Sequence, residues 1–157
     1  MGFSLVMDKN LLSPCGLYCG VCAIRIAHRD NNEKFKKVLV KVYRPLISKP
    51  DQIQCTGCRS EGIKFKHCQK CSIRNCVERK GIEGCYECND YPCYRIKLFP
   101  IKKARQVIKR AIPEWRKLGT EEWVKLQEQR YLCTECGNPL FRGAKRCNKC
   151  GTMVDIT

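Results

Sequence analysis

Hydrophobic residues recur with helical spacing in two separate parts of the chain. In the first part, between residues 33 and 46, apolar side chains return at intervals of three and four while lysines occupy the opposite face. Asn31 and Asn32 precede this stretch as candidate N-caps, and Pro45 lies where the helix should end. The pattern predicts an amphipathic helix here, with a shorter helix before it over Ala23–Arg29.

The second helical part lies between residues 98 and 130. Its apolar residues fall on one side as far as residue 115, which predicts a helix up to residue 112. We expect Pro113 to begin a following helix at its first position and Gly119 to close that helix. Thr120 is then expected to cap a last helix that leads into the C-terminal segment.

Cysteine and glycine dominate the stretch between these helical parts, over residues 55–93. A three-cysteine pattern with spacings of x2 and x4 begins at Cys68 and recurs seventeen residues later at Cys85. Two copies are too few for a solenoid. We therefore expect a pair of cysteine-rich knuckles formed by loops.

Fifteen cysteines in 157 residues change the interpretation of this pattern. The length suggests one ordinary domain or two small modules, and this cysteine density is typical of a scaffold held by disulfides or metals. The chain shows neither a signal-peptide pattern nor an apolar run of about 20 residues. We therefore expect a cytoplasmic protein without a membrane segment, whose reduced thiols bind metal. The odd cysteine count also argues against a closed disulfide framework.

The formal net charge is +16, with 31 Lys and Arg against 15 Asp and Glu. Each four-thiolate zinc site carries −2, so three such sites would leave about +10. A basic surface suggests nucleic acid or another polyanion as a partner, although it also serves solubility. The candidate surface is a basic helix face, and a solvated face without a partner is the alternative. It comprises Lys102, Lys103, Arg105, Lys109 and Arg110.

The strongest metal signal is at the C-terminus. Two CxxC pairs, each followed by glycine, are separated by ten residues; their cysteines are Cys133, Cys136, Cys147 and Cys150. Each pair presents two thiolates from one tight turn, so that four sulfurs can surround one zinc ion at about 2.3 Å. All four positions are then filled, which leaves none for a substrate water. The spacing predicts a structural β zinc ribbon.

The other eleven cysteines allow two groupings. A sequential grouping gives two complete sites: Cys55, Cys58, Cys68 and Cys71, then Cys76, Cys85, Cys88 and Cys93. It leaves three cysteines in need of a fourth ligand, for which only His28 and His67 are available: Cys15, Cys19 and Cys22. A crossed grouping pairs Cys19 and Cys22 with Cys55 and Cys58, and Cys68 and Cys71 with Cys85 and Cys88. Spacing alone does not choose between them.

Iron–sulfur clusters are the alternative to zinc at these positions, because four thiolates suit either. The paired CxxC motifs and the absence of a ferredoxin-type ligand run favour several zinc ions. Cys15-x3-Cys19-x2-Cys22 has the spacing of the cluster loop in radical adenosylmethionine enzymes. Those enzymes need a (β/α) barrel of about 200 residues or more, and this chain lacks the strand–helix alternation. No Ser/His/Asp set or paired-carboxylate site is evident either.

Four motifs resemble one known family. They are Cys-Gly-Leu-Tyr-Cys-Gly-Val-Cys at 15–22, Cys-Thr-Gly-Cys at 55–58, Cys-Gln-Lys-Cys-Ser-Ile-Arg-Asn-Cys at 68–76 and Cys-Tyr-Glu-Cys-Asn-Asp-Tyr-Pro-Cys at 85–93. Together they resemble the prokaryotic cysteine-rich domain-of-unknown-function family 3795, over about residues 13–100. The tail from Trp123 to Cys133 resembles the helix and ribbon that some members append. The resemblance implies metal binding and supplies no established reaction.

These observations predict a small metal-stabilised α+β protein. We expect a cysteine-rich zinc-knuckle domain with amphipathic helices over residues 1–100, a basic helical linker over 101–130, and a β zinc ribbon over 131–157. The predicted function is a non-catalytic zinc-binding module for nucleic acid or a protein partner. An iron–sulfur protein in electron transfer or redox sensing is the alternative, and an enzyme with a catalytic metal in the Cys15 loop ranks below both.

Overall fold

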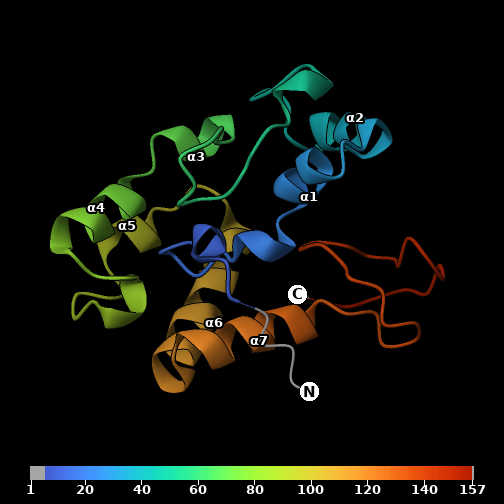
Figure 1. Ribbon diagram of the computed structural model, residues 1–157. Coiled ribbons are helices and arrows are strands. Elements are labelled where there is room, and N and C mark those ends of the chain that lie inside the picture. Colours follow the sequence, from blue (N-terminus) through green and yellow to red (C-terminus); the bar gives the residue numbers. More distant parts are fainter. Residues whose placement is uncertain (1–5, 157) are drawn as a thin grey trace.

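The structure, a computed structural model, describes residues 6–156 and is mostly helical (Figure 1). Its α-helices are α1 (Ala23–Arg29), α2 (Glu33–Val42), α3 (Lys66–Gln69), α4 (Ser72–Lys80), α5 (Tyr94–Lys97), α6 (Lys102–Leu118) and α7 (Thr120–Arg130). Short 3-10 helices are η1 (Lys9–Leu11), η2 (Cys19–Val21), η3 (Pro50–Gln52) and η4 (Cys85–Glu87). None of the helices within residues 6–156 has both the length and the apolar character needed to cross a bilayer.

The predicted amphipathic helix is confirmed as α2. Asn32 is its N-cap, and the Asn32 side-chain oxygen accepts a hydrogen bond of 3.0 Å from the backbone N–H of Phe35. The helix ends at Val42, three residues before Pro45. Its buried face packs with α1 and the following loops in a hydrophobic cluster, the α1–α2 cluster. That cluster contains Ala23, Ile24, Ala27, Leu39, Val40, Ile47, Ile53, Cys55 and Phe65.

The prediction that Pro113 begins a new helix is wrong. Helix α6 runs without a break from Lys102 to Leu118 with Pro113 inside it. Proline removes a hydrogen bond from a helix interior, yet Ile112 and Trp115 beside it are fully buried. Tertiary packing of these neighbours outweighs the local cost, and the proline ring faces solvent. Gly119 ends the helix as expected, at φ +77°.

Thr120 does not act as the expected N-cap either. Gly119 holds that position, and Thr120 is already the first residue of α7. The Thr120 hydroxyl instead accepts a hydrogen bond of 3.0 Å from the Trp115 indole and donates one of 2.7 Å to Glu83. The threonine therefore joins α6, α7 and the loop before η4.

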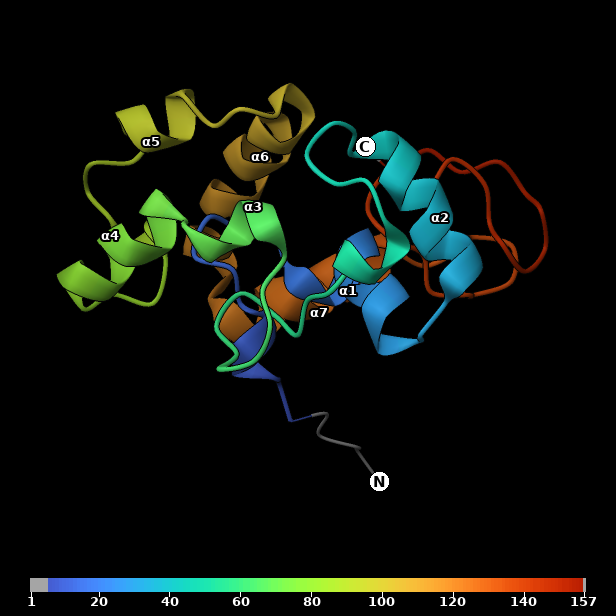
Figure 2. The same ribbon diagram turned by 90° about the horizontal axis from the view of Figure 1, so that it is seen from above.

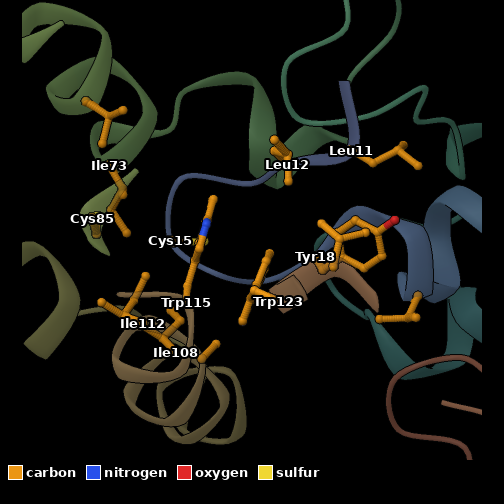
Figure 3. Packing of buried hydrophobic residues seen from close by; sticks show 14 of the residues in the cluster. Leu11, Leu12, Cys15, Tyr18, Ile73, Cys85, Ile108, Ile112, Trp115 and Trp123 are labelled. Atoms are coloured by element: carbon orange, nitrogen blue, oxygen red, sulfur yellow. The ribbon is translucent and has the colours of Figure 1, made fainter. Parts of the chain in front are cut away.

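The largest hydrophobic cluster, the main core, is built around stacked aromatic rings (Figure 3). Trp115 of α6 and Trp123 of α7 stack at 4.2 Å between ring centroids, and Tyr86 stacks on the other side of Trp115 at 4.4 Å. Tyr18 meets Trp123 edge-on at 6.0 Å. Large aromatic rings each bury about 150–250 Å². The basic segment after residue 100 thus supplies much of the core that the N-terminal cysteine loops pack against.

The expectation of an α+β fold with a C-terminal β zinc ribbon is wrong. Between residues 6 and 156 the structure has no sheet, and its only β pairing consists of the isolated bridges Leu132↔Pro139 and Arg146↔Met153. Each bridge flanks a tight turn around one CxxC pair. Backbone hydrogen bonds close these turns: Cys133 N–H donates to Asn138 O at 2.9 Å, and Cys147 N–H donates to Thr152 O at 2.8 Å. Because these bonds lie within single turns, no ladder long enough for a strand forms.

Helix α4 lies where we expected only loops. Cys71 is its N-cap, and Gly81 ends it in the left-handed region at φ +63°. Ile73 and Val77, four residues apart, turn its apolar side into the main core. In both views α3, α4 and α5 lie on the opposite side of the molecule from the C-terminal cysteine segment (Figures 1 and 2).

Candidate metal centres

The four C-terminal cysteines meet in one group. Their sulfur atoms all lie within 4.8 Å of one another. Cys133 and Cys150 sulfurs are 3.6 Å apart, and Cys136 and Cys147 sulfurs are 3.7 Å apart. Four ligands at about 2.3 Å from a tetrahedral ion would stand about 3.8 Å from one another. This group can hold a metal ion.

Two glycines make the turns that bring these sulfurs together. Gly137 follows the first pair at φ +69°, and Gly151 follows the second at φ +76°. Their backbone N–H groups donate to Cys133 O at 2.8 Å and to Cys147 O at 3.0 Å. The same turn geometry therefore occurs twice, as the repeated CxxCG motif suggests.

The electrostatics of the group favour a bound cation. Hydrogen bonds with the Thr152 hydroxyl and backbone lower the pKa of Cys150 to about 6. At Cys136 the backbone N–H of Asn138 favours the thiolate, but desolvation and the neighbouring sulfurs prevail and raise the pKa to about 12. Four adjacent sulfurs cannot all ionise unless a positive charge offsets their repulsion. A metal ion supplies that charge.

The C-terminal segment is docked on the N-terminal part of the chain. The Arg142 backbone N–H donates to Val21 O at 2.7 Å, and the Arg142 guanidinium donates to Tyr18 O at 2.6 Å. Phe141 packs on Phe35 of α2 with 4.7 Å between ring centroids. The four-cysteine group is thus docked beside η2 and α2 through Phe141 and Arg142.

A second set of cysteines surrounds the buried side chain of Arg74 in α4. Its guanidinium donates to Cys68 O at 2.9 Å and to Gln69 O at 3.1 Å, and it lies 3.9 Å from the Cys58 sulfur. A hydrogen bond from the Cys19 thiol lowers the pKa of Cys58 to about 6, with a smaller contribution from the Arg74 guanidinium, although burial opposes this shift. This arginine ties the cysteine loops at 58 and 68 to α4.

Cys68 lies near several of the same cysteines. Burial and the charges of nearby thiolates raise its pKa, and those thiolates are Cys22, Cys55, Cys58 and Cys71. Cys15 is buried on the main-core side, where burial raises its pKa to about 11 although Ser13 Oγ lies 3.1 Å from its sulfur. Among residues 6–156, the C-terminal group is the one set of three or more potential ligands with all ligand atoms within 4.8 Å. The sulfurs around Cys68 are therefore more widely spread.

The remaining four cysteines line one small cavity beside α4: Cys76, Cys85, Cys88 and Cys93. The structure thus brings these four together as in the sequential grouping. Cys68 lies near Cys55, Cys58 and Cys71, its partners in the sequential grouping, and also near Cys22, while Cys19 lies near Cys58. The grouping of these cysteines and the ligand role of each stay predictions.

The two histidines are engaged elsewhere. His28 Nδ1 accepts a hydrogen bond of 2.8 Å from the backbone N–H of Cys55. The His67 ring packs edge-on against Phe99 with 5.9 Å between ring centroids. Neither belongs to the four-ligand group. His28 thus positions a cysteine loop through its backbone.

The cationic side chains of α6 differ in exposure. Lys102, Lys103 and Lys109 are exposed, whereas Arg105 and Arg110 are half-buried. The Arg105 guanidinium donates to Lys97 O at 3.0 Å. The most accessible part of the predicted basic face is therefore the three lysines.

The family model described as "Protein of unknown function (DUF3795)" matches residues 11–98, more than half of the chain. The chain belongs to this family. The match contains all eleven cysteines from Cys15 to Cys93 and ends before the C-terminal four-cysteine group. No curated protein and no solved structure matches the chain. The family assignment confirms the resemblance of the cysteine motifs and adds no reaction or partner.

Proposed function

We propose that this protein is a non-catalytic binding module stabilised by several zinc ions, one of them held by Cys133, Cys136, Cys147 and Cys150. The observation that carries the proposal is the convergence of these four sulfurs, with the two closest pairs at 3.6 and 3.7 Å. Thiolate ligands in tetrahedral array are typical of structural zinc. Four protein ligands fill the coordination sphere, so this centre has no position for a substrate water.

Zinc at this centre would stabilise a segment with little core of its own. Its hydrophobic cluster has four buried members, two of which are ligands: Cys133, Leu140, Ala144 and Cys147. Structural zinc contributes about 10–16 kcal/mol in small finger peptides, which is enough to replace a missing core. Because its thiolates must stay reduced, we also propose a cytoplasmic location.

Anaerobic purification followed by elemental analysis tests the metal. We expect a colourless protein that contains zinc, and Cys136→Ser should lower the zinc content by one equivalent because three thiolates leave the site open. Glu135→Gln is the matched control, since Glu135 is an exposed neighbour outside the four-sulfur group. A brown protein with iron and labile sulfide would instead favour the iron–sulfur alternative.

The proposed partner is nucleic acid, bound through the exposed lysines of α6. Support comes from the net charge of +16 and from the accessibility of Lys102, Lys103 and Lys109. Binding of a single-stranded oligonucleotide should weaken steeply with salt, because each neutralised phosphate releases counterions. Changing the three lysines to glutamine should flatten the salt slope by about one unit per lost contact.

The control for this triple change removes the same charge from α2, through glutamine at Lys34, Lys37 and Lys41, which are also exposed. Both variants should keep their stability to within about 0.5 kcal/mol, since the substitutions are on the surface. Absence of binding at low salt, or equal loss in both variants, would exclude the α6 face as a specific nucleic-acid surface and favour a protein partner.

A further inference from the structure

Four cysteines line one cavity of about 20 Å³. Cys76 lies in α4, Cys85 begins η4, Cys88 is the C-cap of η4, and Cys93 is the N-cap of α5. The rest of the lining is apolar except for two cationic side chains: Ile73, Val77, Ile82, Tyr91, Lys80 and Arg95. Four potential metal ligands thus line a void large enough for about one water-sized atom.

Two contacts hold the loop that carries Cys85 and Cys88 against α6. Arg116 of α6 donates to Tyr86 O at 2.7 Å and to Cys88 O at 3.0 Å. The Tyr86 ring stacks on Trp115 in the main core. Packing against α6 therefore places the loop that carries Cys85 and Cys88 at the cavity.

Charges beside the cavity suit a cluster of thiolates. Lys80 lies one helical turn after Cys76, and its Nζ is 3.3 Å from the Cys88 sulfur and 2.6 Å from the Asp90 carboxylate. One ammonium group cannot neutralise four thiolates, so a divalent cation is needed if all four sulfurs act as ligands.

We propose that this cavity is a second metal centre, in which Cys76, Cys85, Cys88 and Cys93 bind one zinc-class ion and Lys80 donates a hydrogen bond to the Cys88 thiolate. The volume favours a single ion, and four thiolates complete its tetrahedral shell. No three of the four sulfurs in the described chain lie mutually within 4.8 Å, so binding draws them inward. Lys80 is a positioning residue, and the centre does not depend on zinc at the C-terminal group.

The test uses the full chain with Cys136→Ser and Cys150→Ser, which silences the C-terminal group. Titration of the reduced, metal-free protein with Co²⁺ should give the visible bands of tetrahedral thiolate coordination. When Cys88→Ser is added to this variant, the chain should bind one Co²⁺ ion fewer. An unchanged stoichiometry would overturn the proposal.

A footprint on the unmutated chain keeps the proposal testable if Cys88→Ser does not fold. With zinc bound, alkylation followed by peptide mass spectrometry should show Cys76, Cys85, Cys88 and Cys93 protected together, and a chelator should expose them together. Separate exposure of the four thiols would contradict a shared ion. Iron and sulfide protecting the same four would overturn the single-ion assignment.

The metal affinities of two Lys80 variants test the role of this lysine. Removing a partner of a metal ligand typically weakens metal affinity 10- to 100-fold, and because the Lys80 side chain is 40% exposed we expect about tenfold for Lys80→Met. Lys80→Arg, which retains a donor, should restore most of the affinity. Lys37→Met on the exposed face of α2 is the control. Equal affinities for Lys80→Met and Lys80→Arg would exclude the hydrogen bond to Cys88.

Discussion

The two four-cysteine sets of this protein are built in different ways. The C-terminal group comes from two adjacent turns within eighteen residues, Cys133 to Cys150, and its sulfurs converge to 3.6 and 3.7 Å. The cavity set, Cys76 with Cys85, Cys88 and Cys93, comes from two helices and a loop that pack on α6. These four cysteines line a small cavity.

Different forces set the geometry of the two sites. In the C-terminal group, positive-φ glycines and short backbone hydrogen bonds act within each turn, so the sulfurs meet through local structure. In the cavity set, the positions of the cysteines depend on Tyr86, Trp115 and Arg116, which are contacts between distant parts of the chain. Changes in the core should therefore act on one set and changes in the turns on the other.

The largest effect should follow from Trp115→Ala. Trp115 is fully buried between Tyr86 and Trp123, and truncation of such a ring typically costs about 3–5 kcal/mol. We expect this loss in urea unfolding, together with faster alkylation of the cavity cysteines and an unchanged affinity of the C-terminal group for added zinc. Leu118→Ala on the same helix is the control, because Leu118 is 40% exposed. Loss of C-terminal zinc from the folded variant would contradict the separation of the two sets.

A smaller effect is expected from Arg74→Met, which keeps much of the side-chain volume. The change leaves the carbonyls of Cys68 and Gln69 without their donor, at a cost of about 1–3 kcal/mol. The pKa of Cys58 should also rise from about 6, because Arg74 helps to lower it. In the metal-free protein the pH profile of Cys58 alkylation should shift upward.

Arg79→Met, five residues further along α4, is the control for Arg74→Met, since Arg79 is exposed. It should leave both the unfolding free energy and the Cys58 profile unchanged. If Arg74→Met also weakened zinc binding at the C-terminal group, the two regions would be coupled and the comparison would fail.

The smallest effect should come from Gly137→Ala. A Cβ at Gly137 meets no atom within 4 Å, so the cost is conformational strain at φ +69°, about 1–2 kcal/mol. Chelator competition should show about tenfold weaker zinc at the C-terminal group, with the cavity set unaffected. Gly143→Ala is the matched control, because Gly143 is also at positive φ (+91°) with open space but does not follow a CxxC pair. If both substitutions weakened zinc binding equally, the glycine that follows the CxxC pair would have no special part in positioning the sulfurs.

The sequence by itself determined features that depend on neighbouring residues. Asn32 and the spacing of apolar residues after it sufficed to predict α2, because capping and amphipathicity act within a few turns. The repeated CxxCG motif likewise sufficed to predict the C-terminal four-cysteine group, although it did not reveal that the turns lack the ladder of a β ribbon. Gly81 and the Ile73–Val77 spacing were the available signals for α4, and the cysteines around them obscured both.

Only the tertiary structure decided how the other cysteines are arranged. The spacing of Cys76 and Cys85 says nothing about whether they face the same void, because that depends on how α4 and the Tyr86 loop pack on α6. The same packing carries α6 through Pro113, where the local preference favours a new helix. Spacing fixes the geometry of ligands that share a turn, whereas ligands from separate elements take their geometry from the core between them.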